Sequence, residues 1–381
     1  MRYYLIAGEA SGDLHGSNLM KGLKSADKNA QFRYWGGDLM QAEGGELVRH
    51  YKETAVMGLV EVLTHLGKIS RNLNDCKKDI IEYNPDVIIL IDYPGFNFRI
   101  AEFAKKKGFK VFYYIAPKVW AWKENRVHRL KKWVDRLFII FPFEIDYFKK
   151  WGINAIYNGN PLLDSVDNYK YANESIEEFC KRTGIDSCKP FVGLLAGSRK
   201  AEIKYLLPRM VEVAERYPQY NFLLAGAPST NKEIYTDILG KENKNIILLQ
   251  NETYSILKHS KAAIISSGTA SLEAALIGTP QVVGYGGNEI TYRIAMLVLK
   301  IKYISLANLI LDKKIFKELL QHDCTPSKLS DELDMLLNDK EYINKMKADY
   351  ALVREALGGK GASEKVADAM VQELIKMKTN K

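Results

Sequence analysis

The chain has 381 residues, 47% hydrophobic and 27% charged, the composition of a soluble globular protein with room for two or three domains. Lys and Arg outnumber Asp and Glu by 55 to 46, and the net charge of +9 suits either nucleic acid or an anionic membrane surface. No zinc finger, RNA-recognition signature or basic helix with stacking aromatics is present, so nucleic acid is disfavoured, and no apolar run approaches the roughly 18 residues of a membrane-spanning helix.

Strand-like and helical patterns alternate along the whole chain, which is typical of α/β units built around parallel sheets. The first half predicts buried strands at residues 3–7, 86–92, 110–115 and 136–141, with helical stretches such as 98–107 and 123–132 between them. A polar, irregular segment after Pro161 is interpreted as a linker. A second series then predicts strands near residues 191–196, 221–225, 246–249, 262–265 and 281–284, before a helical tail from about Ser327. We therefore expect two doubly wound halves that face one another, with ligands at the carboxyl ends of the strands.

A glycine loop, Gly8 to Gly16, directly follows the first predicted strand. Its spacing is not G-x-G-x-x-G and no acidic residue closes the next strand, so dinucleotide binding is disfavoured. Gly8 and Gly12 still let a substrate approach the backbone, and Glu9 and Asp13 place carboxylates at the ligand edge of the sheet.

The segment Thr54 to Lys68 is too apolar for an ordinary surface helix. It is either buried against the sheet or partly exposed to acyl chains or a bilayer interface. Its apolar stripe comprises Val56, Leu59, Val60, Leu63 and Leu66, and Met57 widens it.

Asp92 ends the predicted strand 87–91 and precedes a turn, where a carboxylate is well placed for general-base work. Asp86 stands at the start of the same strand, where the pattern alone favours a capping or folding role.

A second loop, Gly197-Ser198-Arg199, connects a strand to a helix with Glu202 in its first turn. An arginine there can bind a phosphate through two guanidinium hydrogen bonds, or it can pair with a neighbouring carboxylate. Because a second phosphate-suited loop occurs in the same half, the phosphate contact is favoured.

That other loop lies between Ile264 and Pro280, where an apolar strand runs through Ser267-Gly268-Thr269 into a helix. Backbone N–H groups at such a helix N-terminus favour an anion, usually a phosphate. Glu273, one turn into the helix, can accept hydrogen bonds from a diol such as ribose. An ordinary turn with a surface glutamate is the alternative.

Two patterns give no site. The four cysteines, Cys76, Cys180, Cys188 and Cys324, form no C-x-x-C pair, which favours buried thiols over a metal or disulfide framework. The run Gly358 to Ser363 lacks the spacing of a P-loop and is interpreted as a turn between helices.

Several motifs in a fixed order resemble the lipid-A-disaccharide synthase family, inverting glycosyltransferases that build the lipid A backbone in Gram-negative bacteria. The similarity covers nearly the whole chain. The motifs are G-E-A-S-G-D (8–13), V-M-G-L-V-E-V-L (56–63), P-D-V-I-I-L-I-D (85–92), P-K-V-W-A-W (117–122) with Arg126, G-S-R (197–199), S-G-T-A-S-L-E (267–273), P-Q-V-V-G-Y (280–285) and S-L-A-N-L (305–309).

The resemblance implies a GT-B fold of two facing Rossmann-like domains, at residues 1–165 for the acceptor and membrane and 166–350 for the UDP-sugar. A helical segment, 351–381, would cross back to the first domain. The implied donor is UDP-2,3-diacylglucosamine, the acceptor is 2,3-diacylglucosamine 1-phosphate (lipid X), and the products are the β(1→6) disaccharide 1-phosphate and UDP. Neither metal nor cofactor is implied. The enzyme would be cytoplasmic and peripherally bound to the inner membrane; acyl chain lengths and a homodimer are left open.

The family's functional positions match Glu9, Asp86, Arg199 and Asn308, and Glu273 matches the ribose-binding glutamate of related GT-B enzymes. This resemblance gives Asp86 more weight than its place in the strand does. The expected catalytic residues are Glu9, Asp13, Asp86, Asp92, Arg199 and Asn308. UDP contacts are expected from Gly8, Gly12, Gly197, Ser198, Arg199, Ser267, Gly268, Thr269, Ala270 and Glu273. Acceptor or membrane contacts are expected from Val56, Met57, Leu59, Val60, Leu63, Leu66, Trp120, Trp122 and Arg126.

Two positions depart from the family pattern. Gly95 stands where many members have an aspartate, and Gly159-Asn160-Pro161 replaces a G-H-P motif. The general base is therefore expected to be Asp92, Glu9 or Asp13. A UDP-sugar 2-epimerase of the same fold and a non-enzymatic nucleotide-binding, membrane-docking protein are the alternative functions.

Overall fold

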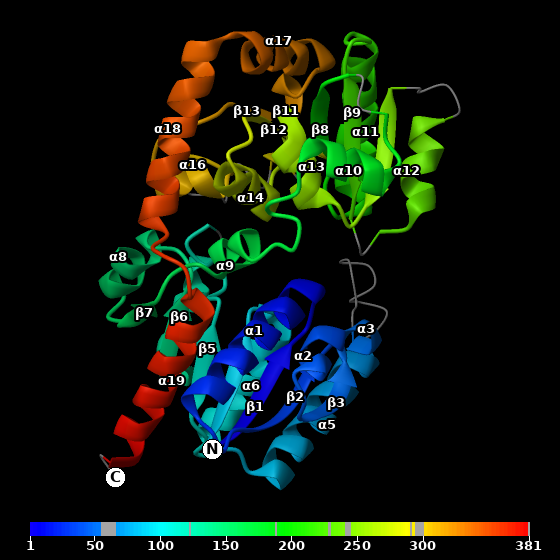
Figure 1. The fold of residues 1–381 in the computed structure, drawn as a ribbon. Helices are drawn as coiled ribbons and strands as arrows, with labels where there is room; N and C mark the ends of the chain where they lie inside the picture. The colour runs from blue at the N-terminus through cyan, green and yellow to red at the C-terminus, as the bar shows by residue number, and fades with distance from the viewer. Residues whose placement is uncertain are drawn as a thin grey trace. The chain divides into compact units, whose positions relative to one another are not determined.

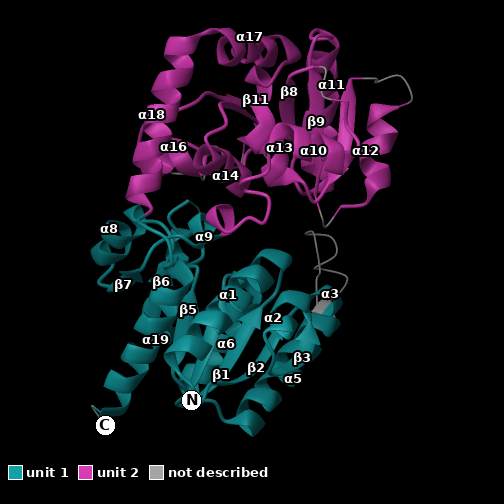
Figure 2. Ribbon diagram, in the orientation of Figure 1, with its two compact units in different colours: residues 1–164, 358–381 teal, residues 165–357 magenta. Residues whose placement is uncertain are grey.

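The computed structural model describes residues 1–54, 66–121, 123–186, 189–227, 230–240, 245–289, 292–293 and 301–379. It divides into two compact units (Figure 2): unit 1 is Met1–Asp164 with Gly358–Lys381, and unit 2 is Ser165–Leu357. The second segment of unit 1 begins at Gly358, because α18 (Lys340–Ala356) continues as one helix within unit 2.

Unit 1 is built on a seven-stranded parallel sheet in the order β3-β2-β1-β4-β5-β6-β7 (Figure 1). The central strand β4 is buried along its whole length, so its uninterrupted apolar sequence fits a sheet covered on both faces. The strands are β1 (Arg2–Ala7), β2 (Gln31–Gly36), β3 (Glu46–His50), β4 (Val87–Ile91), β5 (Val111–Tyr114), β6 (Arg136–Ile139) and β7 (Ala155–Tyr157).

Helices cover both faces of this sheet and form two apolar cores. Leu73, Phe98, Leu130 and Phe148 represent the core under α5, α6, α7 and α8, and Leu19 and Met370 represent the core under α1 and α19. The helices of unit 1 are α1 (Ala10–Ala26), α2 (Asp38–Ala42), α3 (Tyr51–Thr54), α5 (Leu66–Tyr83), α6 (Pro94–Lys106), the 3₁₀ turn η1 (Glu124–Arg126), α7 (Val127–Trp133), α8 (Phe143–Lys150) and α19 (Ala362–Thr379). α9 (Pro161–Asp167) contains the change from unit 1 to unit 2.

The C-terminal helix α19 is fixed to unit 1 along its length. Its start is capped by Asp164, whose carboxylate accepts hydrogen bonds from the N–H groups of Gly361 at 2.7 Å and Ser363 at 3.1 Å. In its middle it packs beside α1 (Figure 1), where a Cβ on Gly22 would lie 2.7 Å from the Cβ of Ala367. Only glycine permits so close an approach of the two helices.

Unit 2 has a six-stranded parallel sheet in the order β10-β9-β8-β11-β12-β13. Its strands are β8 (Phe191–Leu195), β9 (Asn221–Gly226), β10 (Ile246–Gln250), β11 (Ser260–Ser266), β12 (Gln281–Tyr285) and β13 (Glu318–Leu320). Its helices are α10 (Ile176–Thr183), α11 (Lys200–Glu215), α12 (Lys232–Leu239), α13 (Thr253–His259), α14 (Thr269–Ile277), α16 (Leu306–Ile310), η2 (Gln321–Asp323), α17 (Pro326–Asn338) and α18.

The predicted α/β class with two doubly wound parallel sheets is confirmed. The main strands fall where the sequence places them, whereas the short edge strands β3, β7 and β13 are additions. In the described part of the chain no helix is both long and apolar enough to cross a bilayer.

Candidate functional site

A cavity of about 200 Å³ lies in unit 2 where β8, β9 and β11 end. All three strands run in parallel, so their carboxyl ends and the loops after them meet at one edge of the sheet. Many residues expected from sequence to bind the nucleotide line this cavity, namely Gly197, Ser198, Ser267, Gly268, Thr269, Ala270 and Glu273. The remaining lining residues are Leu195, Glu202, Ala225, Ala227, Thr253 and Ser266.

The first turn of α14 forms one wall of the cavity. Gly268 is the N-cap of this nine-residue helix, and a Cβ added to it would meet no atom within 4 Å. A ligand can therefore approach the backbone closely at this point. The first N–H groups of a helix have no acceptor within it, and together with the helix dipole they favour an anion.

Arg199 does not line the cavity in this structure. Its side chain is 79% exposed and forms an ion pair with Glu202, with 3.1 Å between Nη1 and Oε1. The other oxygen of Glu202 accepts the N–H groups of Ser198 at 3.2 Å and Arg199 at 3.4 Å. Of the two roles that the sequence left open for Arg199, the structure shows the pairing with a neighbouring carboxylate. Glu202 thus accepts hydrogen bonds from both amides that directly precede α11.

Glu273 lies on the cavity wall, and its Oε1 accepts a hydrogen bond from the hydroxyl of Tyr254 at 2.9 Å. Burial raises the pKa of Glu273, and the hydrogen bond from Tyr254 opposes that rise. Tyr254, in α13, was missed by the sequence analysis because nothing in its local pattern relates it to a glutamate 19 residues later.

In unit 1, Asp92 follows β4 at the corresponding edge of the sheet. Asp92 and Tyr93 have positive φ angles of 41° and 50°, which are costly for residues other than glycine. The turn is held by the carbonyl of Asp92, which accepts hydrogen bonds from the Tyr113 hydroxyl at 2.6 Å and from Nδ2 of Asn97 at 2.8 Å. Gly95, in the next helix turn, is exposed, with open space where a Cβ would be.

The carboxyl of Asp92 is close to charged neighbours. Burial raises its pKa to about 6, the charge of Glu9 adds to that rise, and Lys118 and the Tyr93 amide oppose it. Glu9 itself is exposed at the N-cap of α1. Asp92 is therefore mostly ionised near pH 7 and has the pKa of an effective general base.

Three residues that the sequence predicts to be catalytic, Asp13, Asn308 and Asp86, accept hydrogen bonds from backbone N–H groups. Asp13 is 3% exposed and accepts the N–H groups of Gly37, Leu39 and Met40 at 2.7 to 3.0 Å, which caps α2. Both of its oxygens are occupied, so Asp13 is a poor candidate for the base. Asn308 is fully buried. Its Oδ1 accepts the N–H of Ile315, and its Nδ2 donates to the carbonyl of Phe316 and to the carboxylate of Glu318, which holds the segment that leads into β13.

Asp86 lies at the amino end of β4, at the edge of the sheet opposite to Asp92. Its carboxylate accepts hydrogen bonds from the N–H of Arg2 at 2.7 Å and from Lys378 of α19 at 2.8 Å. Burial alone would raise the pKa of Asp86, but these two hydrogen bonds, together with the positive charges of Lys378 and of the chain's N-terminus, lower it. The contacts assign Asp86 to the attachment of α19, as its place in the strand suggested.

Gly8 and Gly12 belong to unit 1 and do not line the cavity at the strand ends of unit 2. A Cβ on Gly8 would lie 2.4 Å from the ring of Tyr93, and one on Gly12 would lie 3.1 Å from the Cβ of Ala7. Both glycines allow close packing around β1 and the Asp92 turn, and the UDP contacts expected from them stay a prediction.

A buried carboxyl that the sequence analysis missed lies near the expected acceptor residues. Glu144, 1% exposed, accepts hydrogen bonds from the indole N–H of Trp120 at 3.0 Å and from the N–H of Phe141 at 3.1 Å. Burial raises its pKa to about 7, against the effect of these hydrogen bonds and of Lys118. The pKa of Arg126, which is half-buried, is lowered by burial and by the charge of Arg129. Trp122, Val56, Met57, Leu59, Val60 and Leu63 lie outside the described residues, as does the side chain of Leu66.

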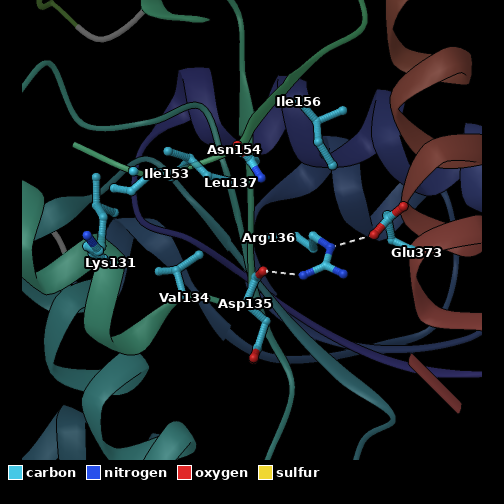
Figure 3. Close-up of a pocket in the computed structure, with 11 residues that line it drawn as sticks. Lys131, Val134, Asp135, Arg136, Leu137, Ile153, Asn154, Ile156 and Glu373 are labelled. Carbon is cyan, nitrogen blue, oxygen red and sulfur yellow. Dashed lines mark hydrogen bonds and ion pairs between the residues drawn. The ribbon is translucent and has the colours of Figure 1, made fainter. Parts of the chain in front are cut away.

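A larger cavity of about 470 Å³ lies near the start of β6 (Figure 3). Arg136 points into it and is paired with Glu373 of α19 at 2.5 Å. None of the expected site residues lines this cavity. Within the described residues no group of three or more His, Cys, Asp or Glu side chains could hold a metal ion.

The comparisons with known proteins agree with one family. The family model described as lipid-A-disaccharide synthetase matches residues 3–373. The lipid-A-disaccharide synthase of Geobacter metallireducens is 37% identical over 98% of both chains, and that of Nitrosococcus oceani is 36% identical over 97% of this chain and 95% of its own.

Similar solved structures share the fold at low identity. They include UDP-GlcNAc 2-epimerase from Neisseria meningitidis bound to UDP-GlcNAc (TM-score 0.71, 13% identity, covering 99% of this chain and 100% of that one). A glycosyltransferase from Rickettsia africae has a TM-score of 0.61 at 12% identity and covers 98% of both chains.

The raised pKa of Glu144 makes stability depend on pH. Between the ordinary pKa of 4.5 and the folded value of about 7, the folded protein holds a proton that the unfolded chain releases, so stability falls as pH rises through this window. A shift of this size corresponds to about 3 kcal/mol. We expect the wild type to lose about 2–3 kcal/mol relative to Glu144→Gln between pH 5 and pH 8.

Urea unfolding followed by tryptophan fluorescence measures this difference, because all five tryptophans (35, 120, 122, 133 and 151) belong to unit 1. If the difference in unfolding free energy between the two proteins did not change from pH 5 to pH 8, the pKa of Glu144 would not be raised in the folded protein.

Proposed function

The chain belongs to the lipid-A-disaccharide synthetase family and is a glycosyltransferase of lipid A disaccharide formation, and we propose that unit 2 binds its UDP-sugar donor while unit 1 supplies the general base. The donor is UDP-2,3-diacylglucosamine and the acceptor is 2,3-diacylglucosamine 1-phosphate. The observation that carries this division is the gathering of the motif residues of unit 2 around one cavity at the carboxyl ends of its strands.

The diphosphate of UDP binds at the amides that open α14, and Glu273 accepts hydrogen bonds from the ribose. The lining residues include two carboxylates, Glu202 and Glu273, and no lysine or arginine. Charge on the diphosphate is therefore balanced by helix N–H groups and by Arg199, which must exchange Glu202 for a phosphate oxygen. Stabilising the departing UDP is the main electrostatic task, since cleavage of a sugar–phosphate bond passes through an oxocarbenium-like state.

Asp92 takes the proton from the 6-hydroxyl of the acceptor. The hydroxyl oxygen then bonds to the anomeric carbon of the donor from the face opposite to UDP, and the bond to the UDP oxygen breaks. One displacement inverts the configuration and gives the β(1→6) disaccharide 1-phosphate. Asp92 is favoured as the base because it is half-buried and has a pKa of about 6. Asp13 is less suitable because it accepts hydrogen bonds from backbone N–H groups, and Glu9 is less suitable because it is exposed.

Both substrates are lipids, so the enzyme works at the cytoplasmic surface of the inner membrane. The apolar stripe from Val56 to Leu66 and the net charge of +9 support binding to an anionic bilayer.

The reaction itself is tested by incubating the protein with both lipids and analysing the products by mass spectrometry. We expect UDP and the disaccharide 1-phosphate with both lipids present, and no conversion of the donor alone. An isomer of the UDP-sugar would instead identify a 2-epimerase, and binding of UDP without turnover would identify a non-enzymatic protein.

The choice of base is tested by two matched substitutions at opposite ends of β4. Asp92→Asn should lower kcat about 10²–10⁴-fold without loss of stability, because it removes the proton acceptor and a poorly solvated charge. Asp86→Asn should lower stability through the lost bond to Lys378 and leave kcat close to wild type. In the wild type, kcat/KM should rise with pH through about 6 as Asp92 ionises. The opposite pattern, with turnover lost only in Asp86→Asn, would refute the assignment.

The exchange at Arg199 is tested by calorimetric titration with UDP. Arg199→Ala should weaken UDP binding and lower kcat about 10²-fold or more, because a charge-assisted contact to the leaving group is lost. Glu202→Gln should bind UDP about 3–10-fold more tightly, since a neutral side chain still caps the helix but no longer competes as an anion. Weaker UDP binding by Glu202→Gln would mean that Glu202 supports the nucleotide.

A further inference from the structure

The hydroxyl of Tyr254 contacts the one carboxylate that is expected to bind the ribose. Glu273 lines the cavity, whereas Tyr254 is not among the lining residues and donates to Oε1 from the neighbouring helix α13 at 2.9 Å. In the described part of the chain no other hydrogen bond to the carboxylate of Glu273 is found. One of its two oxygens is therefore held by protein, and the other remains available to a ligand.

Tyr254 is itself held firmly. Its ring packs edge-on against the ring of Tyr169, with 5.2 Å between centroids, and the Tyr169 hydroxyl is 2.9 Å from Oγ of Ser255. Ser255 also accepts a hydrogen bond from Arg182 at 3.3 Å. The phenol is thus braced by residues from α10 and from the segment after α9.

Arg182 anchors this cluster. Its guanidinium pairs with Glu174 at 2.6 Å and with Glu252 at 2.5 Å, and it lies 3.7 Å from the centroid of the Tyr171 ring. Glu252 directly precedes α13, so the ion pairs fix the start of the helix that carries Tyr254. A side chain braced in this way can define the position of its hydrogen-bond partner.

A glutamate that accepts hydrogen bonds from the two hydroxyls of a ribose must hold its carboxylate in one orientation. A free glutamate side chain populates several rotamers, and fixing it on binding costs affinity. A preformed hydrogen bond to Oε1 removes that cost and helps to keep the half-buried carboxyl ionised, because burial favours its protonated form.

We propose that Tyr254 is a positioning residue that sets Glu273 to recognise the ribose hydroxyls of the nucleotide, so that discrimination between ribose and deoxyribose depends on it. This inference rests on the proposed nucleotide site of unit 2. A purely structural tie between α13 and α14 is the alternative, and it predicts equal effects on every nucleotide.

The test is calorimetric titration of the full chain with UDP and with 2′,3′-dideoxy-UDP, which lacks both hydroxyls. Wild type should prefer UDP about 10-fold or more, because a site built to bond a hydroxyl rejects the analogue that lacks it. Tyr254→Phe keeps the ring and should lose about 5–10-fold in affinity for UDP, but less than about 2-fold for the dideoxy analogue. Tyr169→Phe, which removes a hydroxyl from the same cluster without touching Glu273, should keep the wild-type preference.

Equal losses for both nucleotides in Tyr254→Phe would show a structural tie, and unchanged affinities for both would show that Glu273 needs no positioning. Either result overturns the inference and leaves the proposed binding of UDP in unit 2 intact. A wild type that binds both nucleotides equally would overturn the inference together with the proposed contact between Glu273 and the ribose. Failure of the wild type to bind UDP at all would overturn the proposed function as well.

Discussion

The parallel pairing of every strand is the constraint on which the site depends. In both sheets the strands all end at the same edge, so loops far apart in sequence are brought together there. In unit 2 this edge joins the segments after β8 and β11, and in unit 1 it carries Asp92 after β4. Helices that begin at the same edge direct their first N–H groups toward it, and the residues that line the cavity of unit 2 include no lysine or arginine.

The same constraint separates groups that look alike in sequence. Asp86 and Asp92 bracket one five-residue strand, yet the first attaches α19 and the second has a raised pKa beside Glu9. Asp13 is one residue after Gly12 at the ligand edge, but three backbone N–H groups occupy it. The role of each carboxylate therefore follows from the end of the strand at which it lies and from the hydrogen-bond donors that contact it.

The sequence predicted what depends on local pattern. Ser267 to Ala270 and Glu273 stand where an apolar strand changes to a helix, and that change is visible in the residues themselves. Contacts between distant elements were not visible. The hydrogen bond from Tyr254 to Glu273, the burial of Glu144 against Trp120 and the packing of Gly8 against Tyr93 each join segments with no shared pattern. The edge strands β7 and β13 have three residues each, too few for alternation to identify them, and β3 has only two apolar residues, Leu47 and Val48.

A crystal structure of the protein with UDP would show whether the nucleotide binds at the strand ends of unit 2. We expect density for the diphosphate at the N-terminus of α14 and for the ribose beside Glu273, with Arg199 released from Glu202. Density in the cavity of Arg136 and Glu373, or an empty cavity beside Glu273 at saturating UDP, would contradict it.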